Sequence, residues 1–91
     1  MVVGTDDFRI FQAIVKETLD YKGEHYPINK TSFRKIMFKY DVCKSLVTSN
    51  NIFERLEGQE FIVKIPNHPM KLDSIDTDKV RKRFRDISGV S

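Results

Sequence analysis

The side chains best suited to chemistry in this sequence are hydrogen-bonding groups that recur at helical spacing in its middle. At i, i+4, i+7 and i+11 they form one stripe, flanked by two serines; the stripe is Lys44, Thr48, Asn51 and Arg55, and the flanking residues are Ser45 and Ser49. Arginine and lysine can donate to guanine, asparagine can pair with adenine through two hydrogen bonds, and hydroxyl groups can reach phosphates or bases. Any solvated helix shows a similar polar face, so plain solvation is the alternative interpretation.

Residues suited to catalysis or to metal binding are few. His25 and His68 are the only histidines, and neither has a cysteine or carboxylate at the spacing of metal ligands. Cys43 begins a predicted helix, where its thiolate would be favoured, but a nucleophile also needs a base and an oxyanion site. We therefore predict that the chain is not an enzyme and binds no metal, cofactor or small-molecule ligand. Cys43 is interpreted as a small packing residue.

The length and composition predict one soluble domain. The chain has 91 residues, of which 40% are hydrophobic and 32% charged, which is typical of a globular domain too small for a deep substrate cavity. No window approaches the roughly 18 apolar residues of a membrane span, and the N-terminus does not resemble a signal peptide. A single cysteine suits a reducing compartment. We expect no membrane partner and an intracellular location, in the cytoplasm and nucleoid or in a eukaryotic nucleus.

The positive charge is concentrated in parts of the chain, although the net charge is only +3. Residues 1–21 have a balance of −2, residues 28–50 a balance of +4, and residues 71–91 a balance of +2. Such clustering favours a polyanionic partner. The alternative is a solvated face that happens to be rich in lysine.

The first quarter of the chain predicts a helix followed by a short strand. Apolar residues at helical spacing place an amphipathic helix at residues 6–21, with Thr5 as its N-cap and Lys22-Gly23 at its end. Residues 24–29 are predicted to contain a short edge strand, because proline at position 27 is tolerated only at a sheet edge.

A second helix is predicted to begin at Thr31 or Ser32. Its core face recurs at i, i+3, i+4 and i+7 and consists of Phe33, Ile36, Met37 and Tyr40. Tyr40-Asp41-Val42 is predicted to be a turn, because aspartate tolerates turn geometry and the apolar face changes phase there. The alternative is one continuous helix from Thr31 to Leu56, which would favour a helical bundle.

A third helix and two strands are predicted to follow this turn. The helix runs from Cys43 to Glu57 and is stopped by Gly58. Its core side consists of Leu46, Ile52, Phe53 and Leu56. A strand is predicted at Phe61–Ile65, a constrained loop at Pro66–Pro69 and a return strand at Met70–Leu72.

The last helix is predicted to be capped by Asp76 or Thr77. Its apolar seam consists of Val80, Phe84 and Ile87, and the remaining surface carries Lys79, Arg81, Lys82, Arg83 and Arg85. This seam packs either on the domain core or against a second copy of the chain. Phe38, which is apolar on the polar side of the second helix, is a further candidate dimer contact.

The order of helix, short strand, helix, turn, helix, two-stranded wing and helix resembles the winged helix-turn-helix superfamily. The resemblance covers Thr5 to Ser88, and its most family-like string is IFERLEGQEFI at residues 52–62. It implies a mainly α fold with a small β-hairpin, as one domain over residues 1–91 with flexible tails at 1–4 and 88–91. Asp41 departs from the family pattern, in which glycine is commoner at this turn.

This resemblance implies a double-stranded DNA-binding domain of a transcriptional regulator, in which the third helix enters the major groove. The residues that would face DNA are Lys44, Ser45, Thr48, Asn51 and Arg55; those that would hold phosphates are Lys30, Arg34 and Lys35; and His68 and Lys71 would lie on the wing. Many proteins of this layout are homodimers. The alternative is a protein-interaction module that docks a polymerase or larger assembly, indicated by Phe38, the limited net charge and the acidic first helix.

Overall fold

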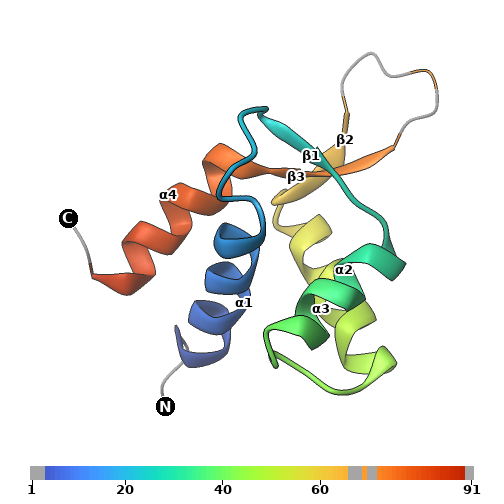
Figure 1. The fold of residues 1–91 in the computed structure, drawn as a ribbon, viewed down its shortest axis with the longest axis vertical. Helices are drawn as coiled ribbons and strands as arrows, with labels where there is room; N and C mark the ends of the chain where they lie inside the picture. The colour runs from blue at the N-terminus through green and yellow to red at the C-terminus, as the bar shows by residue number, and fades with distance from the viewer. Residues whose placement is uncertain (1–3, 66–68, 70–71, 90–91) are drawn as a thin grey trace.

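The computed structural model describes residues 4–65, 69 and 72–89, and within them the chain forms four helices and three short strands (Figure 1). In chain order these are α1 (Gly4–Glu17), β1 (His25–Pro27), α2 (Lys30–Lys39), α3 (Leu46–Gly58), β2 (Ile62–Lys64), β3 (Asp73–Asp76) and α4 (Thr77–Ser88). The prediction of a mainly helical fold with a small β element is confirmed, and the elements follow one another in the predicted order.

The helices lie in two pairs with the sheet at one end of both. Figure 1 shows α1 beside α4 on one side of the molecule and α2 beside α3 on the other. Aromatic side chains connect these parts: Phe11 of α1 meets Phe61 edge-on with ring centroids 4.9 Å apart, and Phe33 of α2 meets Phe53 of α3 at 5.4 Å. All four rings are buried, so one continuous core joins both helix pairs.

The α1 helix is shifted toward the N-terminus relative to the prediction. It begins at Gly4, so Thr5 lies inside its first turn rather than capping it, and it ends at Glu17 instead of residue 21. The Thr18 hydroxyl donates to the Ile14 carbonyl at 2.8 Å and the chain then turns, which leaves Leu19 68% exposed. The Ile14 carbonyl also accepts the Thr18 backbone N–H at 3.0 Å, so helical hydrogen bonding continues to Thr18 before the chain turns.

The α2 helix has the predicted core face but an earlier start. Its N-cap is Asn29 rather than Thr31 or Ser32, and Ser32 closes a capping box with it: the Asn29 side chain accepts from the Ser32 N–H at 2.8 Å, while the Ser32 hydroxyl accepts from the Asn29 N–H at 3.0 Å. Phe33, Ile36 and Met37 are buried, as predicted, and Tyr40 is half-buried at the C-cap.

The predicted turn between α2 and α3 is confirmed, and a continuous helix through this region is excluded. Asp41 has a φ of +57°, in the left-handed region, and the Val42 N–H donates to the Met37 carbonyl at 2.8 Å. Aspartate tolerates this conformation better than most residues. Arg9 of α1 donates to the Asp41 carbonyl, so the turn is also fastened to the first helix.

The α3 helix starts later than predicted, and its predicted core side is confirmed at Phe53 and Leu56 but not at Leu46. It begins at Leu46 behind the N-cap Ser45, so Lys44 lies outside it. Its buried residues are Ser49, Phe53 and Leu56. Leu46, expected in the core, is 49% exposed. Gly58 is the last helical residue rather than the residue after the helix.

The three strands form an antiparallel sheet of order β1-β3-β2, in which β1 is the predicted edge strand. The described return strand is Asp73–Asp76. Of the predicted return strand Met70–Leu72, Leu72 lies outside β3, and Met70 and Lys71 are outside the described residues. Ser74 and Ile75 are both buried, Ile75 in the core cluster. This strand was not predicted because three of its four residues are polar, so it lacks the apolar residues that usually indicate a strand. It leads directly into α4, whose N-cap is Asp76 as predicted.

The last helix packs on α1 within the same chain. Val80 is 1% exposed, and Phe84 stacks on Phe8 with ring centroids 5.3 Å apart. Arg81 reaches across to donate to the carbonyls of Thr18 at 2.7 Å and Tyr21 at 3.4 Å. The apolar seam of α4 therefore packs on the domain core, which was the first of the two arrangements predicted for it.

The turn conformation makes the stability depend on the residue at position 41. We expect Asp41→Gly to keep the free energy of unfolding within about 1 kcal/mol of the wild type, because glycine adopts positive φ without strain. Asp41→Val should lower it by roughly 1–2 kcal/mol, because a β-branched residue resists this conformation. Urea unfolding followed by circular dichroism measures both. Asp20→Val, at an exposed aspartate with negative φ, is the control, and equal effects of glycine and valine at position 41 would contradict this account.

Candidate nucleic-acid interface

The outward face of α3 is defined by the residues opposite its buried side. Ser49, Phe53 and Leu56 face inward, so at 100° per residue the outward side is centred near Asn51. Arg55 lies on one flank of this side, and the row Val47, Asn51 and Glu54 runs along the other. All three are exposed, Val47 to 68%. Figure 1 shows α3 on the far side of the molecule from α4. We call these three residues the outer row.

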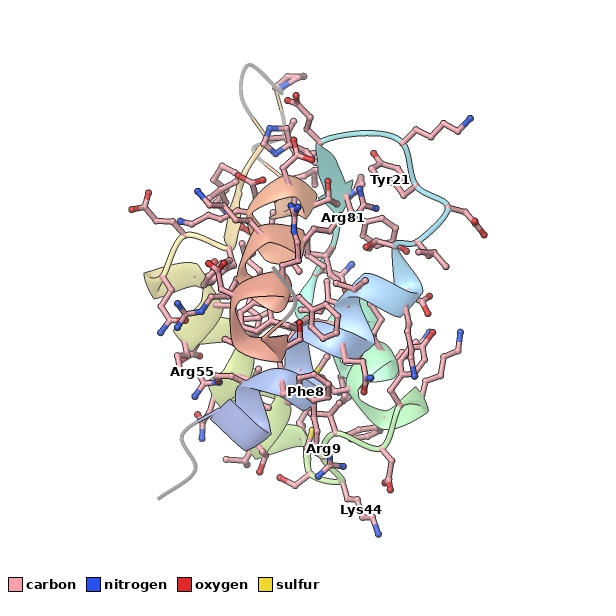
Figure 2. All side chains as sticks on the ribbon, turned by 90° about the vertical axis from the view of Figure 1, so that its left-hand side faces the viewer. Phe8, Arg9, Tyr21, Lys44, Arg55 and Arg81 are labelled. Atoms are coloured by element: carbon pink, nitrogen blue, oxygen red, sulfur yellow. The ribbon has the colours of Figure 1, made fainter. Side chains whose placement is uncertain are left out.

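The predicted stripe is only partly on this face. Asn51 belongs to the outer row, whereas Thr48 and Arg55 are exposed on one flank of it. Lys44 is exposed in the turn before the helix, and Figure 2 shows it at the same end of the molecule as Arg9. The outward face is turned away from the stripe that the sequence indicated because Ser49 is buried and Leu46 is exposed.

The two serines that flank the stripe have structural positions. The Ser45 hydroxyl accepts from the Thr48 N–H at 3.0 Å and donates to the Thr48 hydroxyl at 3.1 Å, so it caps the helix. Ser49 is fully buried, and its hydroxyl has no hydrogen-bond partner among the described residues. A buried hydroxyl without a partner destabilises the fold.

Two cations of the predicted interface are paired with carboxylates. Arg55 donates to Asp7 of α1 at 2.8 Å, and Lys30 at the start of α2 lies 3.3 Å from Glu54. The Asp7 carboxylate is 20% exposed and the Arg55 side chain 46%. Both pairs are open to water, so each stabilises the fold little and a competing anion can replace the carboxylate.

The remaining cations of α2 lie on two different sides of that helix. Arg34 is one helical turn after Lys30 and therefore on the same side, toward Glu54. Lys35 lines a hollow of about 180 Å³ together with Glu17, Tyr26 and Lys39, away from α3. The structure thus brings Lys30 and Arg34 toward the outer row and separates Lys35 from it.

Ion pairs also occupy lysines outside this face. Lys39 and Lys64 contact Glu17 at 3.0 Å and Asp73 at 2.7 Å. Hydrogen bonding to Glu17 raises the pKa of Lys39, and hydrogen bonding to Asp73 raises the pKa of Lys64. Both shifts favour the charged form that a lysine already has at neutral pH, so neither introduces a titration near pH 7.

The predicted wing falls partly on residues that the structure describes. His68 and Lys71, both predicted to contact nucleic acid, lie outside the described residues. Within the described part, β2 and β3 pair in antiparallel orientation and are joined by the Lys64–Asp73 ion pair.

The predicted dimer contacts are mostly used inside the chain. Val80 is buried and unavailable to a second copy, and Phe84 and Ile87 are half-buried against the core. Phe38, by contrast, is 43% exposed.

Two cations of α4, expected to cover its outer surface, bind backbone carbonyls of other parts of the chain instead. Lys79 donates to the Gln59 carbonyl at 3.0 Å, beyond the end of α3, and its ammonium lies 5.0 Å from the centre of the Phe61 ring. Arg81 binds the carbonyls that follow α1, and Figure 2 shows it beside Tyr21. The other three cations of α4 are exposed: Lys82, Arg83 and Arg85.

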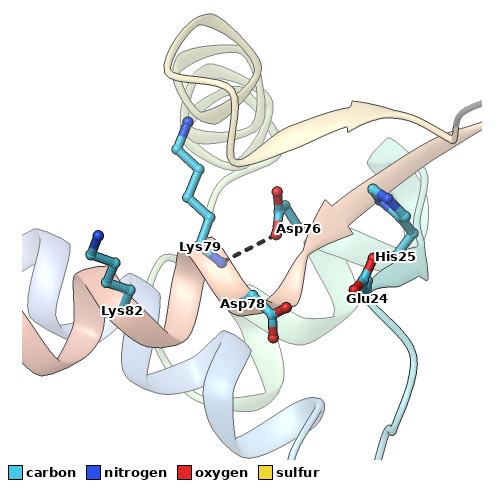
Figure 3. A pocket seen from close by; sticks show the side chains of 6 residues that line it. All are labelled: Glu24, His25, Asp76, Asp78, Lys79 and Lys82. Carbon is cyan, nitrogen blue, oxygen red and sulfur yellow. Dashed lines mark hydrogen bonds between the residues drawn. The ribbon is translucent and has the colours of Figure 1, made fainter.

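An open hollow of about 350 Å³ lies between β1 and the start of α4 (Figure 3). Its lining mixes both signs of charge: Glu24, His25, Asp76, Asp78, Lys79 and Lys82. His25 Nδ1 lies 3.3 Å from the Ser74 hydroxyl, and the Asp76 carboxylate accepts the Lys79 backbone N–H. Across residues 4–65, 69 and 72–89, no set of three or more His, Cys, Asp or Glu side chains is arranged to hold a metal ion.

Cys43, interpreted as a packing residue, is a half-buried free thiol that packs at the edge of the core. Within the described segments, no helix combines the length and the apolar character needed to cross a membrane.

Comparison with protein-family models, with curated proteins and with solved structures finds no match for this chain. The candidate interface therefore depends on the geometry of the molecule itself.

Sequence reasoning missed Val47, Glu54 and Asp7. Val47 is apolar and Glu54 acidic, so neither fits a search for basic and polar DNA contacts. The sequence carried no signal for the α3 residues, because the inward side of this helix includes a buried serine, Ser49, while Leu46 is exposed.

Two serines in the same region should respond oppositely to alanine. We expect Ser49→Ala to raise the free energy of unfolding by about 1 kcal/mol, because it removes an unpartnered buried hydroxyl and improves helix propensity. Ser45→Ala should lower it by about 1 kcal/mol through loss of the N-cap. Urea unfolding measures both, and a destabilised Ser49→Ala variant would show that this hydroxyl has a stabilising partner.

Proposed function

We propose that this chain is a winged helix-turn-helix domain that binds double-stranded DNA as part of a transcriptional regulator. The observation that carries the proposal is the sequence of α2, a tight turn and α3, where α3 leaves a whole face exposed and leads into an antiparallel strand pair. In this layout the third helix occupies the major groove, and the wing formed by β2 and β3 touches the backbone.

The distribution of cations around α3 supports this proposal. Lys44 lies before the Val47 end of the outer row, Lys30 lies 3.3 Å from Glu54 at the other end, and Arg34 follows one turn after Lys30 on α2. A duplex presents phosphates along both walls of its major groove, so cations at both ends of the reading face can hold the backbones while the helix lies between them.

The outer row itself contributes no positive charge, because its residues are valine, asparagine and glutamate. Affinity would then come from the flanking cations, and the row would supply base discrimination. About four to six phosphate contacts would make binding fall roughly 10²- to 10³-fold between about 50 and 200 mM salt.

A protein-docking function is the second candidate, and one observation favours it. Phe38, Leu46 and Val47 are 43%, 49% and 68% exposed, on the two helices that flank the turn. Exposed apolar side chains of this kind would supply the contacts of a surface that binds a protein. Such docking, for example to a polymerase or a larger assembly, would change little with salt.

Binding to a duplex is tested with cation-to-glutamine pairs. Fluorescence anisotropy with a labelled random-sequence duplex at about 50 and 200 mM salt should show binding that collapses at the higher concentration. We expect the double variant Arg34→Gln with Lys44→Gln to weaken binding at least several-fold and to reduce the salt slope by about 2.

The matched control is Lys16→Gln with Lys22→Gln, two exposed lysines outside the interface. It removes the same net charge. Absence of duplex binding at the lower salt, or equal losses in the two double variants, would contradict the proposal and favour the docking function.

The Asp7–Arg55 pair predicts a variant with increased affinity. Asp7→Asn should release Arg55 to a phosphate, so duplex binding should strengthen and the salt slope should steepen by about 1. Anisotropy titrations at several salt concentrations measure both quantities. Asp20→Asn removes an equal charge at an exposed position and should leave the slope unchanged; identical behaviour of the two variants would exclude a role of Arg55 in binding.

A further inference from the structure

Glu54 occupies an unusual position for an acidic residue in a face that would meet a polyanion. It lies in the outer row with Val47 and Asn51, at i, i+4 and i+7, on successive turns of α3. At about 1.5 Å per residue the row extends roughly 10 Å along the helix axis, about three base-pair steps at 3.4 Å each. One short row can therefore contact neighbouring base pairs.

The chemistry of the row selects particular base edges. A carboxylate only accepts hydrogen bonds, and guanine presents the acceptors N7 and O6 in the major groove, whereas thymine presents the acceptor O4. Cytosine presents its N4 amino donor alone. Adenine presents its amino donor beside the N7 acceptor, an edge that matches the donor and acceptor of Asn51 better.

Lys30 reduces the electrostatic repulsion that a carboxylate at position 54 would meet from DNA phosphates. Its ammonium lies 3.3 Å from Glu54 Oε2, with the lysine and glutamate side chains 51% and 60% exposed. The pair contributes little to stability because it is exposed. Its charge offsets that of the carboxylate next to DNA phosphates.

From this arrangement we propose that Glu54 determines specificity by accepting a hydrogen bond from the N4 amino group of a cytosine in the major groove. The inference rests on the proposed function. The target of the outer row is a duplex segment in which this cytosine neighbours an adenine read by Asn51, with a thymine methyl group against Val47.

The test separates base preference from affinity. Duplexes selected from a random-core library by the wild-type protein identify the preferred site, and anisotropy then measures each base substitution within it. We expect one cytosine position at which substitution weakens wild-type binding roughly 5- to 150-fold. Glu54→Gln should lose most of that discrimination, because an amide also donates to guanine and pairs with adenine, and should bind random duplex more tightly.

Two further variants exclude a merely structural role. Lys30→Gln breaks the same ion pair but keeps the carboxylate, so it should weaken binding to all duplexes alike and retain the cytosine preference. Asp20→Asn matches the charge change of Glu54→Gln at an exposed turn and should leave every base preference unaltered. Urea unfolding of each variant confirms that it is folded.

The outcomes distinguish this inference from the proposed function. If the wild type fails to bind any duplex at low salt, that result contradicts both the proposed function and the inference about Glu54. If the wild type binds duplex without base preference, or if Glu54→Gln keeps the wild-type preference at every position, DNA binding stands and the role of Glu54 is overturned.

Discussion

The reversal of the chain at Asp41 is the constraint on which the rest of the structure depends. The left-handed conformation at this residue, closed by the hydrogen bond from Val42 to Met37, ends α2 and sends the chain back along it. Phe33 and Phe53 can then meet edge-on in the core. This packing fixes the inward side of α3, and with it the residues that α3 presents to solvent.

Three of the basic side chains bind backbone carbonyls of the same chain, which changes how the basic pI of about 9.1 should be understood. Arg9 and Arg81 bind backbone carbonyls at turns, and Lys79 binds a carbonyl beyond the end of α3. These groups satisfy acceptors that helix ends and turns leave unpaired. A sum over the sequence counts them as surface charge, so the net charge overstates the positive charge that the proposed DNA-binding face around α3 would have.

The helices and their order could be predicted from the sequence because the 3.6-residue period is strong where a helix buries a broad apolar face. Phe33, Ile36 and Met37 are an example, and the turn at Asp41 followed from the change of phase after them. The face of α3 could not be predicted in the same way, because a serine is buried there while Leu46 and Val47 are exposed. Tertiary packing overrides residue type at these positions. The strand at Asp73–Asp76 was missed for a similar reason, since only contact with β1 and β2 reveals its pairing.

The stacking of Phe8 on Phe84 has a consequence for the order of folding. These rings belong to α1 and α4, the helices at the two ends of the element order (Figure 1), and their positions are 76 residues apart in the chain. A contact of this sequence separation closes a long loop, so chain entropy must be lost before the contact stabilises the fold. The docking of α4 on α1 therefore makes folding slower than it would be if all the core contacts were local.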